Sequence, residues 1–269
     1  MQATNRLQKS LKLGGPSFGA WQMLPGTNFT RVICRSASNL DWLLVDLEHG
    51  NISDDGMHEI VAAAAACGVS PVVRVVEGQR WMIKRALDSG AHGILVPMLE
   101  TAEDAKNVVR YSKYPPVGNR GFECALAVEK FVGRDPSSGK VRQLSNNEYL
   151  QQANDSLVIA VQIETKAALA NVKEIATVPG IDVLFIGPND LGINIGHPIA
   201  ESGEISEELR DAIRTIHEAA QAGGKATGIY CNTGEQAREY ANKGFHMMSV
   251  MTDITGLQDV FRQAFEAAS

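Results

Sequence analysis

Short apolar runs alternate with longer amphipathic segments along most of the chain. Eight runs have the length and composition of buried strands, at residues 18–23, 42–47, 71–76, 93–98, 157–164, 183–187, 226–230 and 246–251. Segments with apolar residues at helical spacing lie between most of them, at residues 54–66, 80–89, 102–113, 165–176, 207–222, 234–243 and 257–268. Helix-sized crossovers between buried strands predict a parallel sheet, and eight strands predict closure into a (β/α)8 TIM barrel.

The length and composition fit one such barrel. The chain has 269 residues, of which 44% are hydrophobic and 21% are charged, enough to bury one sizeable core. Two small domains would suit the length equally well, but no linker, repeat or low-complexity tract divides the chain. We therefore expect a single (β/α)8 domain over residues 1–269. The net charge of −6 argues against a nucleic-acid binder.

Residues 114–153 interrupt the alternation. This segment is rich in proline and glycine, including Pro115-Pro116 and the run from Asp135 to Gly139, and has few periodic apolar positions. Long excursions of this kind in compact domains are functional or disordered. We expect a lid above the site or an interface segment, with a disordered loop as the alternative.

The cysteine spacing and the N-terminal segment indicate the cellular compartment in which the protein is expected. Cys34, Cys67, Cys124 and Cys231 show no C-x-x-C spacing, which indicates neither a zinc ribbon nor a disulfide framework. The first 14 residues lack an apolar core segment, and the longest apolar stretches fall far short of the roughly 20 residues of a membrane span. We expect a soluble, cytoplasmic protein in a reducing compartment, without membrane contact.

Two carboxylates follow the fifth and sixth predicted strands. Glu164 ends the run 158–164, and Asp190 ends the run 183–190. The C-terminal edge of a parallel barrel is where such proteins place their chemistry. Two carboxylates with open positions for water or substrate oxygens suit Mg²⁺ or Mn²⁺. Asp190 could instead be only a helix N-cap.

Other strand ends add polar side chains on the same face. The second predicted strand runs into Asp46 and His49, the third ends at Arg74, and the fifth carries Gln162. Taken singly, such an arginine is usually a surface or salt-bridge residue, and such a histidine is usually structural. Their convergence on one face, above almost wholly apolar strand bodies, favours a functional site.

Three motifs give the chain a family resemblance. They are D-x-E-H at residues 46–49, V-Q-I-E-T at residues 161–165 and F-I-G-P-x-D-L at residues 185–191. With these motifs, over nearly its whole length, the chain resembles the HpcH/HpaI aldolases, metal-dependent class II aldolases that use pyruvate as the nucleophile and fold as a (β/α)8 barrel. The resemblance implies a carbon–carbon lyase acting on 2-keto-4-hydroxy acids, with pyruvate and an aldehyde as the other reaction partners.

The resemblance also implies residue roles. Glu164 and Asp190 would bind the divalent ion, with Mg²⁺ favoured and Mn²⁺ or Co²⁺ possible. Arg74 would contact the pyruvate oxygen, Gln162 would lie beside the metal, and His49 would transfer a proton together with an aspartate. This chemistry requires positive charge near the enolate oxygen. It also requires a base, and a histidine, with a reference pKa of about 6.5, suits that step.

The aspartate that would work with His49 is left open by the sequence. Asp46 lies three residues earlier, and Asp88 lies in the next predicted helix. Family resemblance favours Asp88. An acidic partner would fix the orientation and tautomer of the imidazole.

The substrate would be held by further residues near these strand ends. The turn Gly187-Pro188-Asn189 leads into a helix start or turn whose N–H groups could hold a carboxylate. Asn189 stands where the family usually has a small residue. Trp21, at the end of the first strand, forms an apolar wall of the pocket in one interpretation and is an ordinary core or rim residue in the other.

Alternative functions and the assembly complete the predictions. Oxaloacetate decarboxylation, or macrophomate synthase-like bond formation, would use a similar site, and a non-catalytic binding barrel is the alternative of a different class. A Schiff-base mechanism would need a lysine inside the barrel, and the one strand-associated lysine, Lys225, precedes its strand. The resemblance implies a homohexamer, with the segment 257–268 packed on a neighbouring subunit; its apolar face could equally close its own barrel.

Overall fold

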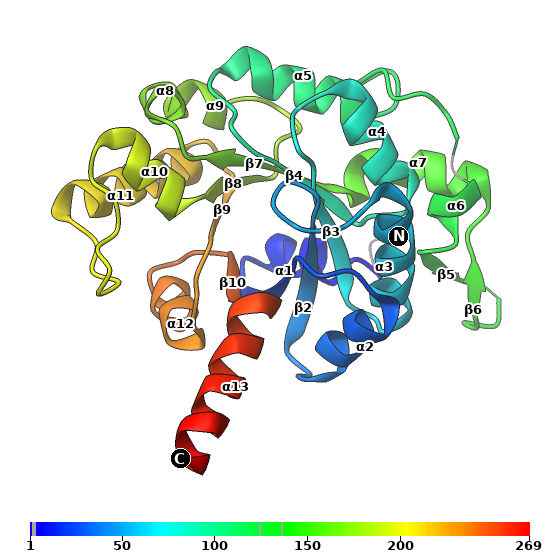
Figure 1. Cartoon of the computed structure of the whole chain (residues 1–269). Helices are drawn as coiled ribbons and strands as arrows, with labels where there is room; N and C mark the ends of the chain where they lie inside the picture. Colours follow the sequence, from blue (N-terminus) through cyan, green and yellow to red (C-terminus); the bar gives the residue numbers. More distant parts are fainter. Residues whose placement is uncertain (2–3, 124, 136) are drawn as a thin grey trace.

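Eight parallel strands close into a barrel in the computed structural model, which describes residues 1, 4–123, 125–135 and 137–269. Cys124 therefore lies outside the described residues. The order around the barrel is β1-β10-β9-β8-β7-β4-β3-β2 (Figure 1). The strands are β1 (Ser17–Gln22), β2 (Leu40–Asp46), β3 (Ser70–Arg74), β4 (Gly93–Val96), β7 (Val158–Ile163), β8 (Val183–Ile186), β9 (Ala226–Ile229) and β10 (Met247–Thr252). The predicted (β/α)8 architecture is confirmed.

Amphipathic helices surround the barrel. In α3, Met57, Ile60, Val61 and Ala64 are buried at helical spacing, and the Ser53 side chain caps the first turn. The helices around the barrel are α2 (Thr27–Arg35), α3 (Asp54–Ala66), α4 (Arg80–Asp88), α5 (Ala102–Ser112), α8 (Lys166–Ala170), α9 (Val172–Ala176), α10 (Pro188–Ile195), α11 (Glu207–Ala222) and α12 (Gly234–Asn242).

Three differences from the predicted helices have local causes. The segment 165–176 forms two helices because the chain departs from helical geometry at Asn171 (φ −97°, ψ 5°). Helix α10 was not predicted because proline at its first position and glycine within it resemble a turn, although proline suits a helix start. Helix α2 was missed because its short polar sequence buries only Thr30 and Cys34.

Side chains on the strands alternate between two apolar layers. One set fills the barrel interior, and the other packs between the barrel and the helices. In β2, for example, Trp42 and Leu44 face the interior, whereas Leu43 and Val45 pack outward. This period of two decides which strand-end residues enter the interior.

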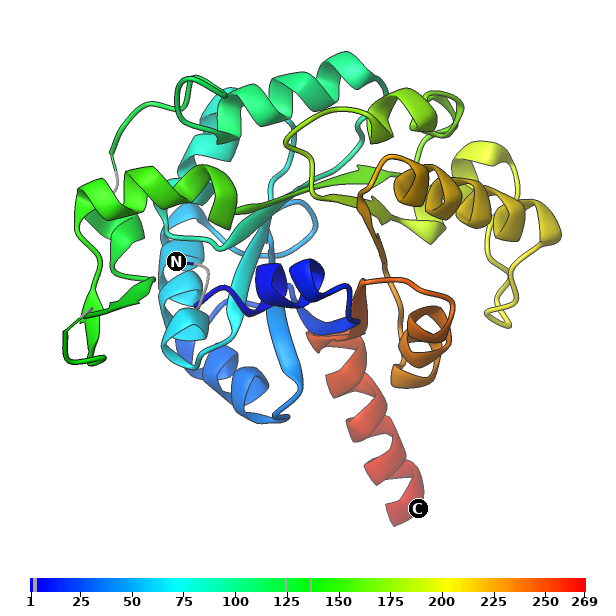
Figure 2. The same cartoon turned by 180° about the vertical axis from the view of Figure 1, so that it is seen from behind.

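The N-terminal end of the barrel is closed by α1 (Arg6–Leu13), which the sequence pattern did not predict (Figure 2). Asn5, fully buried at its start, donates to the carbonyl oxygens of His92 and Ser156, both at 2.8 Å. Leu7 joins the apolar interior of the barrel. The opposite end of the barrel is left for the polar strand ends.

The excursion after α5 also lies at this closed end. It contains α6 (Ala125–Val128), the antiparallel pair β5 (Val132–Arg134) and β6 (Val141–Gln143), and α7 (Asn146–Ser156). The Lys130 carbonyl contacts His92 Nε2 at 3.1 Å, and Thr4 contacts the Val132 backbone at 3.2 Å. The predicted lid is therefore wrong for the chain's own barrel, because the segment connects a helix to the next strand and so meets the N-terminal strand ends.

The last helix, α13 (Asp253–Ala268), projects away from the barrel (Figures 1 and 2). It begins four residues earlier than predicted, with Thr252 as its N-cap. Only Asp253 and Gly256 are buried in this helix. Leu257, Val260, Phe261 and Phe265 are exposed, so the helix does not close its own barrel. No helix in the described part of the chain is long and apolar enough to cross a membrane.

Candidate active site

The alternation of the strands delivers polar residues to the open end of the barrel interior. Asp46 continues the inward series of Trp42 and Leu44 on β2, and Arg74 continues that of Val72 on β3. Asp46 and Arg74 are direct neighbours in the β2/β3 register. Apolar residues hold the barrel together below, and on these two strands the next inward position carries a charge.

These residues surround a cavity of about 170 Å³. The sequence-predicted residues in its wall come from four strands and the start of α10. The lining consists of Trp21, Met23, Asp46, His49, Arg74, Gln162, Gly187, Pro188, Asn189, Asp190, Tyr230 and Thr252. Most of the predicted site thus converges on one cavity.

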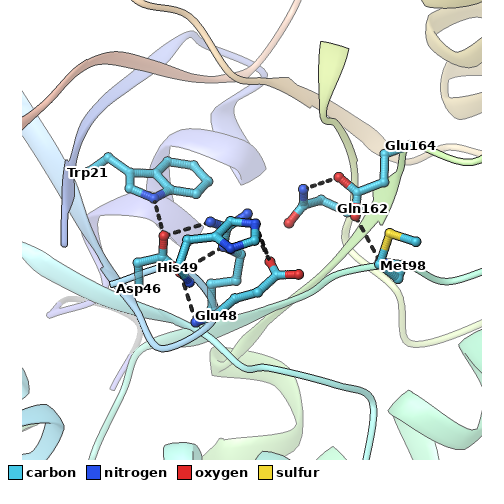
Figure 3. A network of polar contacts seen from close by, with 8 residues as sticks. Trp21, Asp46, Glu48, His49, Met98, Gln162 and Glu164 are labelled. Carbon is cyan, nitrogen blue, oxygen red and sulfur yellow. Dashed lines mark hydrogen bonds and ion pairs between the residues drawn. The ribbon is translucent and has the colours of Figure 1, made fainter. Parts of the chain in front are cut away.

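Arg74 is held by two carboxylates. Its Nε and Nη2 donate to Asp46 Oδ1 and Oδ2 at 2.9 and 2.6 Å, and Nη1 lies 3.0 Å from Glu48 Oε2. The guanidinium also lies over the Trp21 ring, 4.8 Å from its centroid. Trp21 Nε1 donates to Asp46 at 3.0 Å (Figure 3). This packing fixes the plane of the guanidinium.

Asp46 stays ionised despite its burial. Burial alone would raise the pKa of its carboxyl, but the hydrogen bonds and charge of Arg74, together with the Trp21 donor, lower the pKa below its usual range. Its Oδ1 also accepts from the backbone N–H groups of Glu48 and His49, at 3.0 and 3.2 Å. Asp46 therefore anchors both the guanidinium and the turn that follows β2.

Glu164 is not among the residues that line this cavity, but it is held firmly beside Gln162, which is. Its side chain follows Gln162 at the end of β7 and is almost fully buried, with 2% of the residue exposed. Oε1 accepts from the Met98 N–H at 2.8 Å, and Oε2 accepts from Gln162 Nε2 (Figure 3). Met98 has a φ of 53°, and among the described residues it is the one non-glycine residue with a positive φ. Such backbone strain is typical of functional sites.

The electrostatics of Glu164 favour a neighbouring cation. Burial, together with the negative charges of Asp190 and Glu48, raises the pKa of Glu164 to about 7, although the Met98 N–H and Arg74 oppose the shift. A cation between the carboxylates would reverse these unfavourable contributions.

Two local features fit a bound divalent ion. A Cβ at position 187 would collide with the Glu164 carboxylate, so glycine there keeps the space beside it open. Gln162 Oε1 is buried without a hydrogen-bond partner in the described part of the chain. No group of three or more His, Cys, Asp or Glu side chains in the described residues could hold a metal by itself. Glu164 and Asp190 would therefore share the ion with water or substrate oxygens.

His49 lies at the mouth of the cavity without either predicted partner. Its side chain is 62% exposed, and its Nε2 lies 4.0 Å from Glu48 Oε2. Asp46 bonds to the His49 backbone instead of the imidazole. Asp88 ends α4, near the N-terminal strand ends, where it accepts from the buried Arg120 at 2.8 Å. Within the single chain neither aspartate contacts the imidazole, and the pairing of His49 with Asp46 or Asp88 stays a prediction.

Four residues at the site were missed by the sequence analysis. Tyr230 and Thr252 follow or end the last two barrel strands, where the rule applied to the other strand ends would have found them. Glu48 was passed over inside the D-x-E-H motif, and Met23 carried no polar signal.

A larger groove of about 640 Å³ adjoins the cavity and shares Pro188, Asn189 and Tyr230 with it. It runs between α11 and α12, where Arg210 and Gln236 are among its polar residues. The groove and the cavity thus meet at the start of α10 and the end of β9.

Two candidate nucleophiles lie outside the cavity wall. Lys225 Nζ donates to the Val178 carbonyl at 2.9 Å, just before β9. Burial raises the pKa of the Cys231 thiol to about 12, which leaves it protonated at neutral pH.

A parallel barrel with a buried glutamate and a clamped arginine at the C-terminal strand ends is the architecture of a barrel enzyme. Residues 23–259 match the profile of the HpcH/HpaI aldolase/citrate lyase family, and the chain belongs to this family. Enzymes named aldolases are similar to it over nearly its whole length, and the chain is accordingly a carbon–carbon lyase, as expected.

Two such relatives are bacterial. The chain is 35% identical to 2-keto-3-deoxy-L-rhamnonate aldolase of Escherichia coli O17:K52:H18, over 97% of this chain and 91% of that enzyme. It is 33% identical to hydroxypyruvate/pyruvate aldolase of Roseovarius nubinhibens, over 97% and 95%.

Solved structures agree with the fold. An HpcH/HpaI aldolase from Desulfitobacterium hafniense superposes with a TM-score of 0.86 at 26% identity, covering 97% of this chain and 96% of that one. Macrophomate synthase superposes with a TM-score of 0.84 at 26% identity, covering 98% and 89%.

Proposed function

We propose that the protein is a divalent-metal-dependent pyruvate aldolase, which cleaves 2-keto-4-hydroxy acids to pyruvate and an aldehyde or condenses the two. The observation that carries this proposal is the buried Glu164 carboxylate, which is held by the Met98 N–H and Gln162, lies beside the open space at Gly187, and interacts electrostatically with Asp190 and Arg74. The names of the aldolase relatives support the reaction class.

The proposed roles follow from where each side chain is held. When bound by Glu164 and Asp190, a divalent ion such as Mg²⁺, Mn²⁺ or Co²⁺ would polarise the keto oxygen and offset its developing negative charge. Arg74 would add guanidinium donors at that oxygen, in the plane set by Asp46 and Trp21. His49, at the open mouth, would accept the methyl proton.

The substrate carboxylate would bind at the start of α10. Gly187 leaves room for the close approach of substrate, and Pro188 begins the helix. The N–H groups of Asn189 and Asp190 lie in the first turn, where helices leave donors without an internal partner. Trp21 would form one wall, and the aldehyde would enter from the groove beside Tyr230.

Chelation tests the metal requirement. We expect EDTA to abolish cleavage of a 2-keto-4-hydroxy acid and Mn²⁺ or Mg²⁺ to restore it. A proton and a metal compete for Glu164, whose pKa is about 7, so the metal affinity should rise as the pH approaches 7 and level off above it. Full activity in EDTA, or a borohydride-trapped pyruvyl-lysine, would contradict the proposal.

Oxaloacetate decarboxylation is a second candidate because the fold matches macrophomate synthase over nearly its whole length. The same cavity would then receive a carbon nucleophile by loss of CO₂ instead of a proton. Release of CO₂ from oxaloacetate faster than cleavage of any tested hydroxy acid would favour it.

We also propose a homo-oligomer, a hexamer by family resemblance, in which α13 packs on a neighbouring subunit. Its Leu257, Val260, Phe261 and Phe265 form one apolar face that is exposed in the single chain. A stripe of this kind on a projecting helix needs a partner surface to be stable in water.

Charged substitutions on α13 test this assembly. Phe261→Asp and Phe265→Asp should shift the protein to smaller species in light scattering after size exclusion, because a buried unpaired carboxylate opposes packing. Gln263→Asp, elsewhere on the helix, is the control and should keep the wild-type mass. An unchanged mass in both Phe variants would remove α13 from the interface.

A further inference from the structure

We propose that Asp253, the first residue of α13, is a positioning residue for the proton-transfer step, because it holds the loop after β1 against the turn that carries His49. This inference rests on the proposed function and deepens it, since it names a residue outside the cavity wall on which the placement of His49 depends. Asp253 would touch no reacting atom and would act through the backbone.

The first argument is the contact between Asp253 and the loop after β1. Its Oδ2 accepts from the backbone N–H groups of Met23 and Leu24, at 2.9 and 2.8 Å. Oδ1 accepts from the N–H of Ile254 at 2.8 Å, and the residue is only 9% exposed. Hydrogen bonds from N–H groups to a carboxylate are stronger than neutral ones, so this side chain fixes the backbone that donates to it.

The second argument is that the same stretch of backbone meets the turn after β2. The Asn51 N–H donates to the Met23 carbonyl oxygen at 2.8 Å. A Cβ at Gly50 would lie 3.0 Å from this oxygen and 3.1 Å from Met23 Cα, so glycine lets the two backbones approach closely. Met23 therefore connects Asp253, on its N–H side, with the turn on its carbonyl side.

The third argument is what this turn carries. Asp46 Oδ1 accepts from the N–H groups of Glu48 and His49, at 3.0 and 3.2 Å. The segment is thus held at one end by Asp46 and at the other by Met23. Because the His49 side chain is 62% exposed, its place at the mouth of the cavity depends on the backbone beneath it.

The start of α13 also belongs to the cavity wall. Thr252, the N-cap of this helix, lines the cavity together with Met23. Asp253 and Gly256 are the buried residues of α13, so the helix is seated on the barrel through its first turn. A change in how α13 is seated would therefore reach the cavity through Asp253.

Asp253→Ala and Asp253→Asn test the assignment, with Asp259→Asn at an exposed position of the same helix as the matched control. Alanine removes both acceptors, whereas asparagine keeps one carbonyl oxygen for the two N–H groups. Gln22 Nε2 donates to the Leu24 carbonyl oxygen at 2.8 Å, so the loop should stay attached to β1 in both variants.

Three measurements are made on each protein. Amide hydrogen exchange, read by mass spectrometry, compares peptides that cover residues 20–26 and 47–52. Exchange of pyruvate methyl protons in D₂O gives kcat and KM. Calorimetry gives the affinity for Mn²⁺.

We expect Asp253→Ala to speed amide exchange in both peptides and to lower kcat by about 10- to 100-fold, because a misplacement of about 1 Å can cost on the order of 100-fold in rate. KM for pyruvate should change less than kcat, and the Mn²⁺ affinity should stay at the wild-type value. Asp253→Asn should lie between wild type and Asp253→Ala, and Asp259→Asn should match wild type.

Two results would overturn the proposal. Faster amide exchange at 20–26 with wild-type exchange at 47–52 would make Asp253 an anchor of its own loop only. A wild-type kcat in Asp253→Ala would show that His49 does not depend on it. If Asp253→Ala does not fold, Asp253→Asn decides by the same two readouts.

Amide exchange keeps this inference separate from the proposed function. A metal-loaded wild-type protein that does not exchange pyruvate protons contradicts the aldolase proposal. Unchanged protection at 47–52 in the Asp253 variants contradicts the link between Asp253 and the turn that carries His49.

Discussion

Glu164→Ala is expected to lose divalent-metal binding and aldolase activity together. The substitution removes one of the two carboxylates proposed as metal ligands. The other one, Asp190, cannot hold a labile ion alone. Residues that only support a ligand typically contribute 10- to 100-fold to metal affinity, so loss of the ligand itself should weaken Mn²⁺ binding by more than about 100-fold.

Calorimetric titration with Mn²⁺ measures this effect directly. Glu100→Ala, an exposed carboxylate in the loop after β4, is the matched control and should bind like wild type. A thermal melt of the metal-free proteins shows whether Glu164→Ala remains folded. Wild-type Mn²⁺ affinity in a folded Glu164→Ala protein would eliminate the proposed metal site.

Arg74→Lys is expected to be nearly inactive even though it keeps the positive charge. The guanidinium uses Nε, Nη1 and Nη2 to meet Asp46 and Glu48 and lies flat over Trp21, whereas a lysine ammonium is a single point charge. Loss of one well-placed donor to a developing oxyanion costs about 10²- to 10³-fold in kcat, and we expect a loss of at least this size.

Metal binding separates this effect from misfolding. Arg74→Lys should retain the wild-type Mn²⁺ affinity, because Glu164 follows β7 and Asp190 lies in α10, away from β3. Steady-state cleavage of a 2-keto-4-hydroxy acid measures the loss in kcat. Wild-type kcat in the lysine variant would mean that any positive charge suffices at this position.

The barrel was predictable because its signals are local. Strands that are buried on both faces appear in the sequence as continuous apolar runs. Every second residue of such a strand points into the barrel, so counting by twos from Trp42 through Leu44 leads to the polar residue Asp46 at the strand end. Counting forward in this way predicts Arg74 and Gln162 at the open end of the barrel, where the structure has them. Their roles stay predictions.

The sequence pattern does not show relations between distant segments. A sequence pattern cannot show that Asp46 is saturated by Arg74 and Trp21, or that Asp88 belongs to Arg120, because those bonds span 28, 25 and 32 positions. The excursion at 114–153 was placed above the site on composition alone, although its position between α5 and β7 sends it to the closed end. Helix α10 was hidden by proline and glycine, which propensity assigns to turns.

Contacts between subunits cannot be predicted from the pattern within one chain. The exposed apolar face of α13 shows in a single chain that a surface is unpartnered. The surface that covers it is defined by the assembly, and the mass of the Phe261→Asp variant reports on it.

Exchange of pyruvate methyl protons into D₂O, followed by proton NMR, tests the central claim most directly. It needs no knowledge of the aldehyde, because it reads only the formation of the carbon nucleophile. The account predicts exchange by the Mn²⁺- or Mg²⁺-loaded protein, loss of exchange in EDTA and recovery when the metal is returned. Absence of exchange in the metal-loaded protein, or undiminished exchange in EDTA, would contradict it.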